Sequence, residues 1–502
     1  CDAAGGEDCG NCEADCGACV TCGDGVCDAC EGGGCPVDCG PAPPPLPPRR
    51  YDAFDQTITV QVHGFSAVND AEFDDTVYGA ARSAGGQGRA LRLFRPDLVD
   101  GEAHPEAPDQ LIGVEYYGRQ PPDWMTPDQI AAVDAFDPAT HEALPRYAHI
   151  VAFFVRHRMA LSGARYVNFV CHSMGCHVIR YLLEHDLEGL ASDGVVARWY
   201  TVAGVLAGAR LARLFDNPTI RDAATLLALN TSDFVHMHPD YVVDNAAVWD
   251  HRPREANSPL LAGILMHHTV GTDPRVSETA NIVRLLDLNN PGDEPNDGIM
   301  YTLDEFFHDQ AAEGRFVAAD GRRLRPTRSH QHLDHFLISD SEATGALGAA
   351  ALFGGRKVYL TLERVELLDD REQDDAFDFS EEGQPPAELA VEVEVAFDGV
   401  RVHQQHLEDR SPELARMAEG EDRVLDLRVF EGPVPDDLDA LDVHLELLEV
   451  DAYPRFGVLE SLFDAHERLV DFRGSVALRD DTLMLESQFV RAEISVRVVP
   501  LY

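Results

Sequence analysis

The sequence predicts an α/β protein in which a mostly parallel sheet is flanked by helices. The stretch VNFVCHSMGCHVIRYL, residues 167–182, combines an apolar strand, a sharp turn and an amphipathic helix. A second apolar and β-branched strand, TITVQV, precedes it at residues 57–62. From Lys357 onward the pattern changes to apolar and polar residues alternating at period two. This alternation predicts a C-terminal β-sandwich of about eight short strands.

The turn in the first of these stretches carries Ser173, and a serine between a strand and a helix is exposed to a substrate. The alternative is an ordinary turn in which the serine only caps the helix. The usual form is Gly-x-Ser-x-Gly, but here Cys171 replaces the first glycine and Gly175 keeps the second. A disulfide between Cys171 and Cys176 would close a loop of only about six residues and add little stability. We therefore expect two buried thiols.

The residues around this serine resemble a known family. His-Ser-Met-Gly after Val-Asn-Phe-Val, with Arg-Tyr-Leu on the helix, closely resembles secreted bacterial lipases of the α/β-hydrolase superfamily. The resemblance implies an α/β-hydrolase fold and a Ser…Asp…His triad that begins with Ser173. His-Gly-Phe at 63–65 is similar to the oxyanion loop of these lipases. It implies that the backbone N–H groups of Phe65 and Met174 bind the oxyanion.

The acid and the base of the triad each have two candidates. Asn-Asp-Gly at 296–298 resembles the acid loop of bacterial lipases, which implies that Asp297 is the acid. Asp273 is the alternative, because many α/β hydrolases carry their acid directly after an apolar strand. His335 lies just before the last predicted helix of the catalytic region, where this superfamily carries its histidine. His332 is its alternative, because His-Leu-Asp resembles the histidine loop of several bacterial lipases.

The charge of the chain excludes some partners. The formal net charge is −48, from 88 acidic and 40 basic residues. An acidic protein repels phosphate, so we expect no nucleic-acid partner. Such a surface suits a secreted protein in saline surroundings, where salt screens the self-repulsion. No apolar run is long enough for a membrane helix, so we expect no transmembrane segment.

Cysteines gather at the start of the chain. The segment 22–40 echoes the segment 1–17, which indicates two copies of one small module that needs disulfides or metal to fold. These copies resemble cysteine-rich repeats of secreted bacterial proteins. We expect disulfides, with calcium as an optional structural ion and zinc as the alternative. Cys1 matches Cys27, so we interpret it as part of the repeat rather than as a lipidated terminus. The cysteines concerned are Cys1, Cys9, Cys12, Cys16, Cys19, Cys22, Cys27, Cys30, Cys35 and Cys39.

These features predict a modular, extracytoplasmic protein that is secreted or held at the cell surface. GPAPPPLPPRR is typical of a semi-rigid spacer, here between the head and the catalytic region. A long connection near 210–260 is interpreted as a cap over the acyl pocket. The predicted parts are cysteine-rich repeats at 1–39, a proline-rich linker at 40–50, a catalytic domain at 51–356 and the β-sandwich at 357–502.

The predicted function is serine-dependent hydrolysis of carboxylic esters, above all acyl lipids, in solution or at an interface, with no required cofactor. Ser173 attacks the ester, His335 takes its proton and returns it to the leaving alcohol, and Asp297 orients the imidazole. A polyester or cutin-like depolymerase and a phospholipase are the alternatives within this class. A binding protein on an inactive hydrolase scaffold is the alternative from another class, disfavoured by the intact Ser…Asp…His set.

Overall fold

A computed structural model describes residues 50–65, 75–136, 143–219, 232–244, 260–261, 263–273, 295–307, 324, 326–368, 389–407, 421–449, 467–479 and 481–502. The chain divides into two compact units between Arg50 and Tyr51, and all the described helices and strands belong to the second unit. The predictions for the cysteine-rich head, and for nearly all of the linker, lie outside the described residues.

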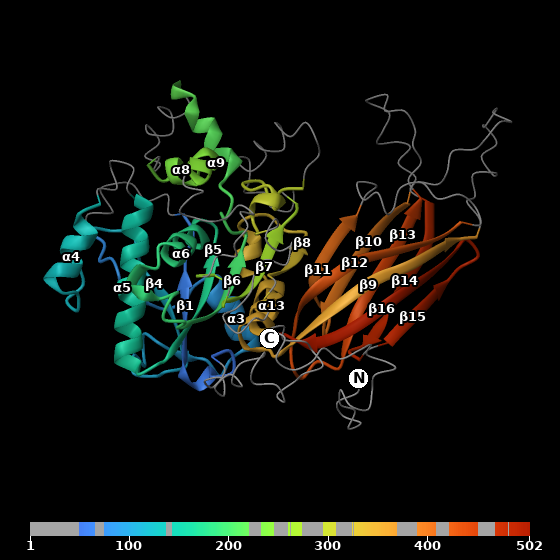
Figure 1. The fold of residues 1–502 in the computed structure, drawn as a ribbon, viewed down its shortest axis with the longest axis horizontal. Helices are drawn as coiled ribbons and strands as arrows, with labels where there is room; N and C mark the ends of the chain where they lie inside the picture. The colour runs from blue at the N-terminus through green and yellow to red at the C-terminus, as the bar shows by residue number, and fades with distance from the viewer. Residues whose placement is uncertain are drawn as a thin grey trace, which may run out of the picture. The chain divides into compact units, whose positions relative to one another are not determined.

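The centre of this unit is a twelve-stranded mixed sheet in the order β15-β16-β9-β12-β8-β7-β6-β5-β1-β4-β2, with β3 beside β4 (Figure 1). Neighbouring strands from β4 through β1, β5, β6 and β7 to β8 run parallel. The bounds in this half are β1 (Thr57–Val62), β2 (Ala81–Arg82), β3 (Val99–Asp100), β4 (Gln110–Val114), β5 (Tyr166–His172), β6 (Val196–Val202), β7 (Leu265–Gly271) and β8 (Thr327–Gln331).

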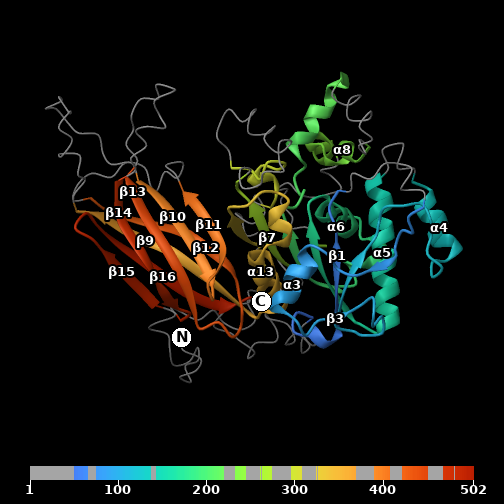
Figure 2. The same cartoon turned by 180° about the vertical axis from the view of Figure 1, so that it is seen from behind.

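Helices cover both faces of the parallel strands, as parallel connections require (Figures 1 and 2). Along β5, Val167, Phe169 and Cys171 join the core formed with α5 (Ala143–Ser162) and α6 (Met174–Glu184). Val170, which points to the opposite face, joins the core formed with α3 (Gln87–Phe94) and α13 (Glu342–Phe353). The period-two alternation of a strand thus divides one apolar segment between two cores.

The C-terminal region contains eight described strands in two sheets. β9, β12, β15 and β16 extend the twelve-stranded sheet, whereas β11-β10-β13-β14 form an antiparallel sheet. Apolar residues of both sheets, such as Leu360 and Val393, share one buried core. The bounds are β9 (Arg356–Leu367), β10 (Leu389–Phe397), β11 (Val400–Leu407), β12 (Asp422–Val434), β13 (Ala440–Glu449), β14 (Glu467–Ala477), β15 (Asp481–Glu486) and β16 (Val490–Pro500).

Residues 357–502 were predicted from the sequence as a separate β-sandwich, but four strands of this region continue the sheet of the catalytic region. β12 pairs with β8 through Glu431 and Arg328, so one sheet runs from the parallel half into the antiparallel half. β8 itself, TRSHQ, is buried at four of five positions although its residues are polar. Hydrogen bonds compensate for this burial: His267 Nδ1 lies 2.8 Å from Thr327 Oγ1, and its Nε2 lies 3.1 Å from Ser329 Oγ.

Part of the region predicted as a cap is described. It contains a 3₁₀ segment, η6 (Arg210–Asp216), and two short helices, α8 (Ser232–Met237) and α9 (Pro239–Asp244). Both helices lie beyond the carboxyl ends of the parallel strands (Figures 1 and 2). Among the described helices, none has the length and apolarity needed to cross a membrane.

Candidate active site

Ser173 occupies the turn between β5 and α6. Its backbone has φ 52 and ψ −128, a conformation that costs a non-glycine residue roughly 1–3 kcal/mol and is typical of functional sites. Its side chain makes no capping hydrogen bond to the helix, unlike that of Ser341 at the start of α13. The turn also brings α6 close to the end of β1: a Cβ on Gly175 would lie 2.2 Å from the carbonyl oxygen of His63. Only glycine fits at position 175.

Cys171 and Cys176 form a disulfide across this turn, which corrects the expectation of two free thiols. The expectation set the close approach of strand and helix against the small entropic gain of a short loop and the strain that could cancel it. The decisive factor is geometry, because the end of β5 and the first turn of α6 bring the two Cα atoms to 5.0 Å, within the usual disulfide range. The indole N–H of Trp199 also lies 3.1 Å from Cys171 Sγ.

His335 and Asp297 lie in line with Ser173. His335 Nε2 is 2.8 Å from Ser173 Oγ, and His335 Nδ1 is 2.5 Å from Asp297 Oδ2. Both side chains are almost fully buried, at 3% and 0% exposed. The Asp297 loop is held in turn, because Oδ1 accepts the backbone N–H groups of Ile299 and Met300 at 2.9 and 2.6 Å. A neutral imidazole in this arrangement donates from Nδ1 and accepts the serine proton at Nε2.

The two alternative candidates contact one another. His332 Nε2 lies 2.5 Å from Asp273 Oδ2, and the His332 side chain is 49% exposed. Among the described residues, the hydrogen-bond partner of Ser173 Oγ is His335. The structure therefore places Ser173, His335 and Asp297 in one hydrogen-bonded chain and sets His332 and Asp273 apart from it.

The groups predicted to bind an oxyanion lie at the ends of β1 and β5. Met174 is the first residue of α6, so its N–H has no acceptor within the helix and lies at the positive end of the helix dipole. Phe65 follows β1, and the carbonyl groups just before it are fixed by Tyr116, whose hydroxyl donates to His63 O at 2.7 Å and to Gly64 O at 3.0 Å.

Two residues near the site were not singled out from the sequence. His172 donates from Nε2 to the carbonyl oxygen of His335 at 2.8 Å. Burial, followed by the neighbouring His335, lowers the pKa of His172 to about 3, so its ring stays neutral and can hold the loop of His335. Its position directly before the serine was the available signal.

Asp233 of α8 is the second such residue. It is 1% exposed and accepts the hydroxyls of Tyr117 at 2.9 Å and Tyr147 at 3.2 Å. Burial raises the pKa of Asp233 to about 7, although the two hydrogen bonds act to lower it. The next residue, Phe234, packs its ring 5.3 Å from that of Phe65. α8 is thus anchored beside the candidate oxyanion loop, and no local sequence pattern signals this.

A cavity of about 260 Å³ opens beside the candidate oxyanion loop after β1. His63, Gly64, Glu115 and His172 contribute to its lining. Glu115 pairs with Arg82 at 2.9 Å and lies 3.5 Å from His63 Nε2. The cavity therefore offers polar surroundings next to the candidate catalytic residues.

Comparisons with known proteins found distant structural likenesses. No protein-family model matches the chain, and no curated protein matches its sequence. Among solved structures, the mature Bacillus licheniformis lipase BlEst2 is 14% identical, with a TM-score of 0.35, over 59% of this chain and 91% of that one. The metagenomic carboxyl esterase MGS0156 is 18% identical, with a TM-score of 0.33, over 63% and 78%. Phospholipase PlaB from Legionella pneumophila is 12% identical, with a TM-score of 0.29, over 50% and 45%. At these TM-scores the likeness assigns neither a family nor an activity.

Proposed function

We propose that this protein hydrolyses carboxylic esters through a serine nucleophile. The observation that carries the proposal is the hydrogen-bonded chain from Ser173 Oγ through the His335 ring to Asp297 Oδ2, with spacings of 2.8 and 2.5 Å. A free serine hydroxyl is almost unreactive near neutral pH, and a histidine oriented by a buried carboxylate is the arrangement that activates it.

Each step uses groups of the chain itself. Ser173 Oγ attacks the ester carbonyl while His335 Nε2 takes its proton, and Asp297 stabilises the imidazolium that forms. The N–H groups of Phe65 and Met174 donate to the developing oxyanion. His335 then gives the proton to the leaving alcohol, which departs and leaves an acyl group on Ser173. Water, activated by the same histidine, releases the acid and restores the serine.

The proposed substrates are acyl lipids. Large apolar side chains are exposed on segments that adjoin the site: Phe336 and Leu337 follow His335, Leu303 follows the Asp297 loop, and Val235 lies on α8. Their exposed fractions are 54%, 44%, 47% and 38%. Exposed apolar groups around a site mark the binding of an apolar substrate or of a lipid surface. This arrangement favours lipids over small soluble esters as the natural substrates.

The assay for the proposed chemistry is release of p-nitrophenol from short and medium acyl esters. Ser173→Ala and His335→Ala are expected to lower kcat by roughly 10⁴–10⁶-fold, and Asp297→Asn by roughly 10³–10⁴-fold. His332→Ala and Asp273→Asn are the matched controls, since they remove the His–Asp pair that lies apart from Ser173, and both are expected to keep most of the activity. The proposal fails if Ser173→Ala remains active while circular dichroism shows it folded.

The substrate class needs a separate measurement. Triacylglycerols, phospholipids and a soluble polyester are compared, each above and below its solubility limit. A rate that rises sharply when a triacylglycerol forms an interface supports the lipase interpretation. Cleavage of phospholipid alone identifies a phospholipase, and cleavage of polyester alone a depolymerase. Equal rates on soluble short esters, with no response to an interface, contradict lipids as substrates.

We also propose that the protein works outside the cytoplasm, where the disulfide between Cys171 and Cys176 can persist. The head at 1–39 and the linker at 40–50 would then attach or target the enzyme. Deletion of residues 1–50 is expected to leave hydrolysis of a soluble ester unchanged. Loss of that activity in the deletion variant would show that the head contributes to the catalytic unit.

A further inference from the structure

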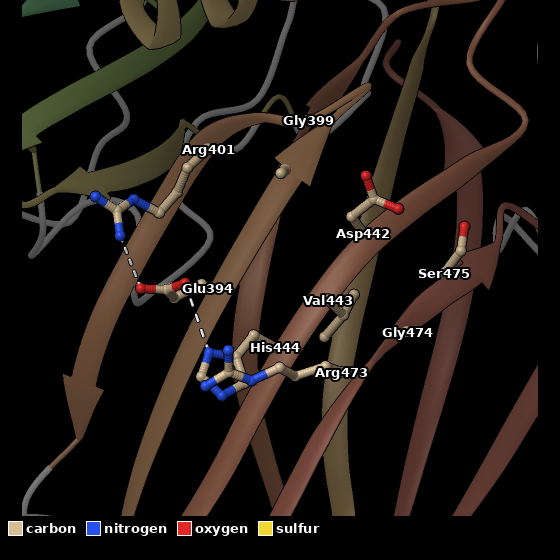
Figure 3. A pocket seen from close by; sticks show the side chains of 10 residues that line it. Glu394, Gly399, Arg401, Asp442, Val443, His444, Arg473, Gly474 and Ser475 are labelled. Atoms are coloured by element: carbon tan, nitrogen blue, oxygen red, sulfur yellow. Dashed lines mark hydrogen bonds and ion pairs between the residues drawn. The ribbon is translucent and has the colours of Figure 1, made fainter.

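A second group of chemically active side chains lies on the antiparallel sheet, outside the candidate active site. A cavity of about 630 Å³ opens on this sheet, lined by Glu394 of β10, Arg401 of β11, His444 of β13 and Arg473 of β14 (Figure 3). Strand register explains why they meet. His444 lies directly opposite Glu394 on one side and Arg473 on the other, so the three side chains share one face.

The His444 ring contacts two carboxylates with the same nitrogen. Nε2 lies 2.9 Å from Glu446 Oε1 and 3.1 Å from Asp471 Oδ1. One ligand atom from each of these three residues lies within 4.8 Å of the others. Two ligands at zinc distances of about 2.0–2.2 Å in a tetrahedral site are separated by about 3.3 Å. The two separations, 2.9 and 3.1 Å, come close to that value.

The other nitrogen of the His444 ring faces a carboxylate as well. Nδ1 lies 3.5 Å from Glu394 Oε2, and Glu394 in turn accepts from Arg401 Nη1 at 2.8 Å (Figure 3). A metal-bound imidazole almost always donates its second N–H to a carboxylate, which fixes the tautomer and the ring orientation. Glu394 therefore supports Nε2 as the ligand atom, independently of the contacts that Nε2 makes.

The charges of this face also favour a bound cation. Glu446 pairs in register with Glu392 on β10 and with Asp471 on β14, so three carboxylates lie side by side in one row. Like charges directly opposite each other destabilise a sheet. With Glu394 and Asp442, the described part of this face carries five carboxylates beside the guanidinium groups of Arg401 and Arg473. The carboxylates thus outnumber the guanidinium groups among the described residues of this face, and Glu446 is only 7% exposed.

We propose that His444, Glu446 and Asp471 form a binding site for a divalent transition-metal ion of the zinc type. One imidazole nitrogen with carboxylate oxygens suits zinc better than calcium, which prefers oxygen ligands alone. The three ligands come from the paired strands β13 and β14, so the ion stabilises this pair, and a water molecule from the cavity completes the coordination. Arg473, which is 66% exposed and 3.6 Å from Glu446, competes with the ion for the carboxylates.

The test measures zinc binding to the full, oxidised chain by calorimetric titration after removal of metals with a chelator. The wild type is compared with His444→Ala, Glu446→Gln and His104→Ala. His104 is the matched control, because it is 62% exposed and lies near a single glutamate, 3.8 Å away. Both site variants are expected to bind one zinc equivalent fewer than the wild type and His104→Ala, whatever the cysteine-rich head binds. Arg473→Ala is expected to bind this zinc more tightly.

A second measurement separates a built site from adventitious binding. Zinc is added at one equivalent more than the cysteine-rich head binds. It is expected to raise the midpoint of thermal unfolding of the wild type and of His104→Ala. The midpoint of Glu446→Gln is expected to stay unchanged. Glu446→Gln keeps the shape of the side chain, so this variant alone tests the zinc site if His444→Ala does not fold. Equal zinc binding by all the variants, or no zinc binding beyond that of the head, would overturn the proposal and leave an ion-pair network.

Discussion

Asp233 makes the stability of the cap region depend on pH in a way that one substitution can isolate. The carboxyl is buried, and its pKa is raised from the ordinary value of 3.8 to about 7. The folded protein therefore keeps a proton that the unfolded chain has already released near neutral pH. A raised pKa contributes stability at low pH, and this contribution is lost as the pH rises through the folded value. Asp233→Asn, which is neutral at every pH, removes this dependence.

The size of the effect follows from the pKa. At about pH 5.5 the folded carboxyl lies about 1.5 units below its pKa, and each unit is worth 1.36 kcal/mol, so the contribution is about 2 kcal/mol. At about pH 8.5 it has fallen to nearly zero. Asparagine keeps one acceptor for the hydroxyls of Tyr117 and Tyr147, so the loss of the other hydrogen bond shifts both ends of the curve equally.

The assay is urea unfolding of the wild type and of Asp233→Asn at both pH values. The difference between the two proteins cancels all other titrating groups, and it is expected to change by about 2 kcal/mol, with the variant gaining on the wild type as the pH rises. Asp193→Asn is the control, since Asp193 is 58% exposed and pairs with Arg156. Parallel curves for the wild type and Asp233→Asn would refute the argument that burial raises this pKa.

Three further perturbations test other parts of the structure. Several histidines are neutral when folded because burial lowers their pKa to about 3, so the unfolded chain binds more protons below about pH 6.5. Each of them costs about 1.4 kcal/mol of stability at about pH 5.5. Urea unfolding of Asp233→Asn, which lacks the opposite contribution of that carboxyl, should show this loss, and a flat profile on acidification would contradict it. A reductant should lower the unfolding midpoint of the wild type, with a loss of at most about 2 kcal/mol of stability because the closed loop is short, and should leave the midpoint of a double variant with serine for Cys171 and Cys176 unchanged. Equal sensitivity of the two proteins would disprove the bond. Gly175→Ala should abolish ester hydrolysis or folding, whereas Gly85→Ala, where a Cβ meets nothing within 4 Å, should be silent. The histidines in question are His172, His177, His268 and His403.

The parts of the fold that sequence could predict are those specified by neighbouring residues. β1 and β5 are rich in apolar and β-branched residues, and the turn at Ser173 follows from the strand, the small residues and the amphipathic helix around it. The pairing of His335 and Asp297 with Ser173 was proposed only from resemblance, because the residues are far apart in the chain. The position just before the predicted helix favoured His335, but it did not exclude His332, which lies three residues away.

The parts that sequence could not predict depend on contacts between distant segments. β8 resembles a loop in sequence because its residues are polar, and it becomes a buried strand only because His267 and other side chains satisfy it. The anchoring of Asp233 depends on hydroxyls from Tyr117 and Tyr147, which belong to different parts of the chain. The disulfide at the serine turn was considered from sequence, but its occurrence depends on how closely strand and helix approach.

The continuity of the sheet across β8 and β12 has a consequence for how the chain is made. Residues up to 356 contain every candidate catalytic group, yet β8 pairs with β12 only when residues near Glu431 have been synthesised. Its His330 N–H likewise gains its acceptor only with His403 Nδ1, 3.1 Å away in the finished protein. Until then a nascent chain presents an unpaired strand edge, a hazard for aggregation. We therefore expect the N-terminal half to complete its sheet only after the C-terminal half has been synthesised.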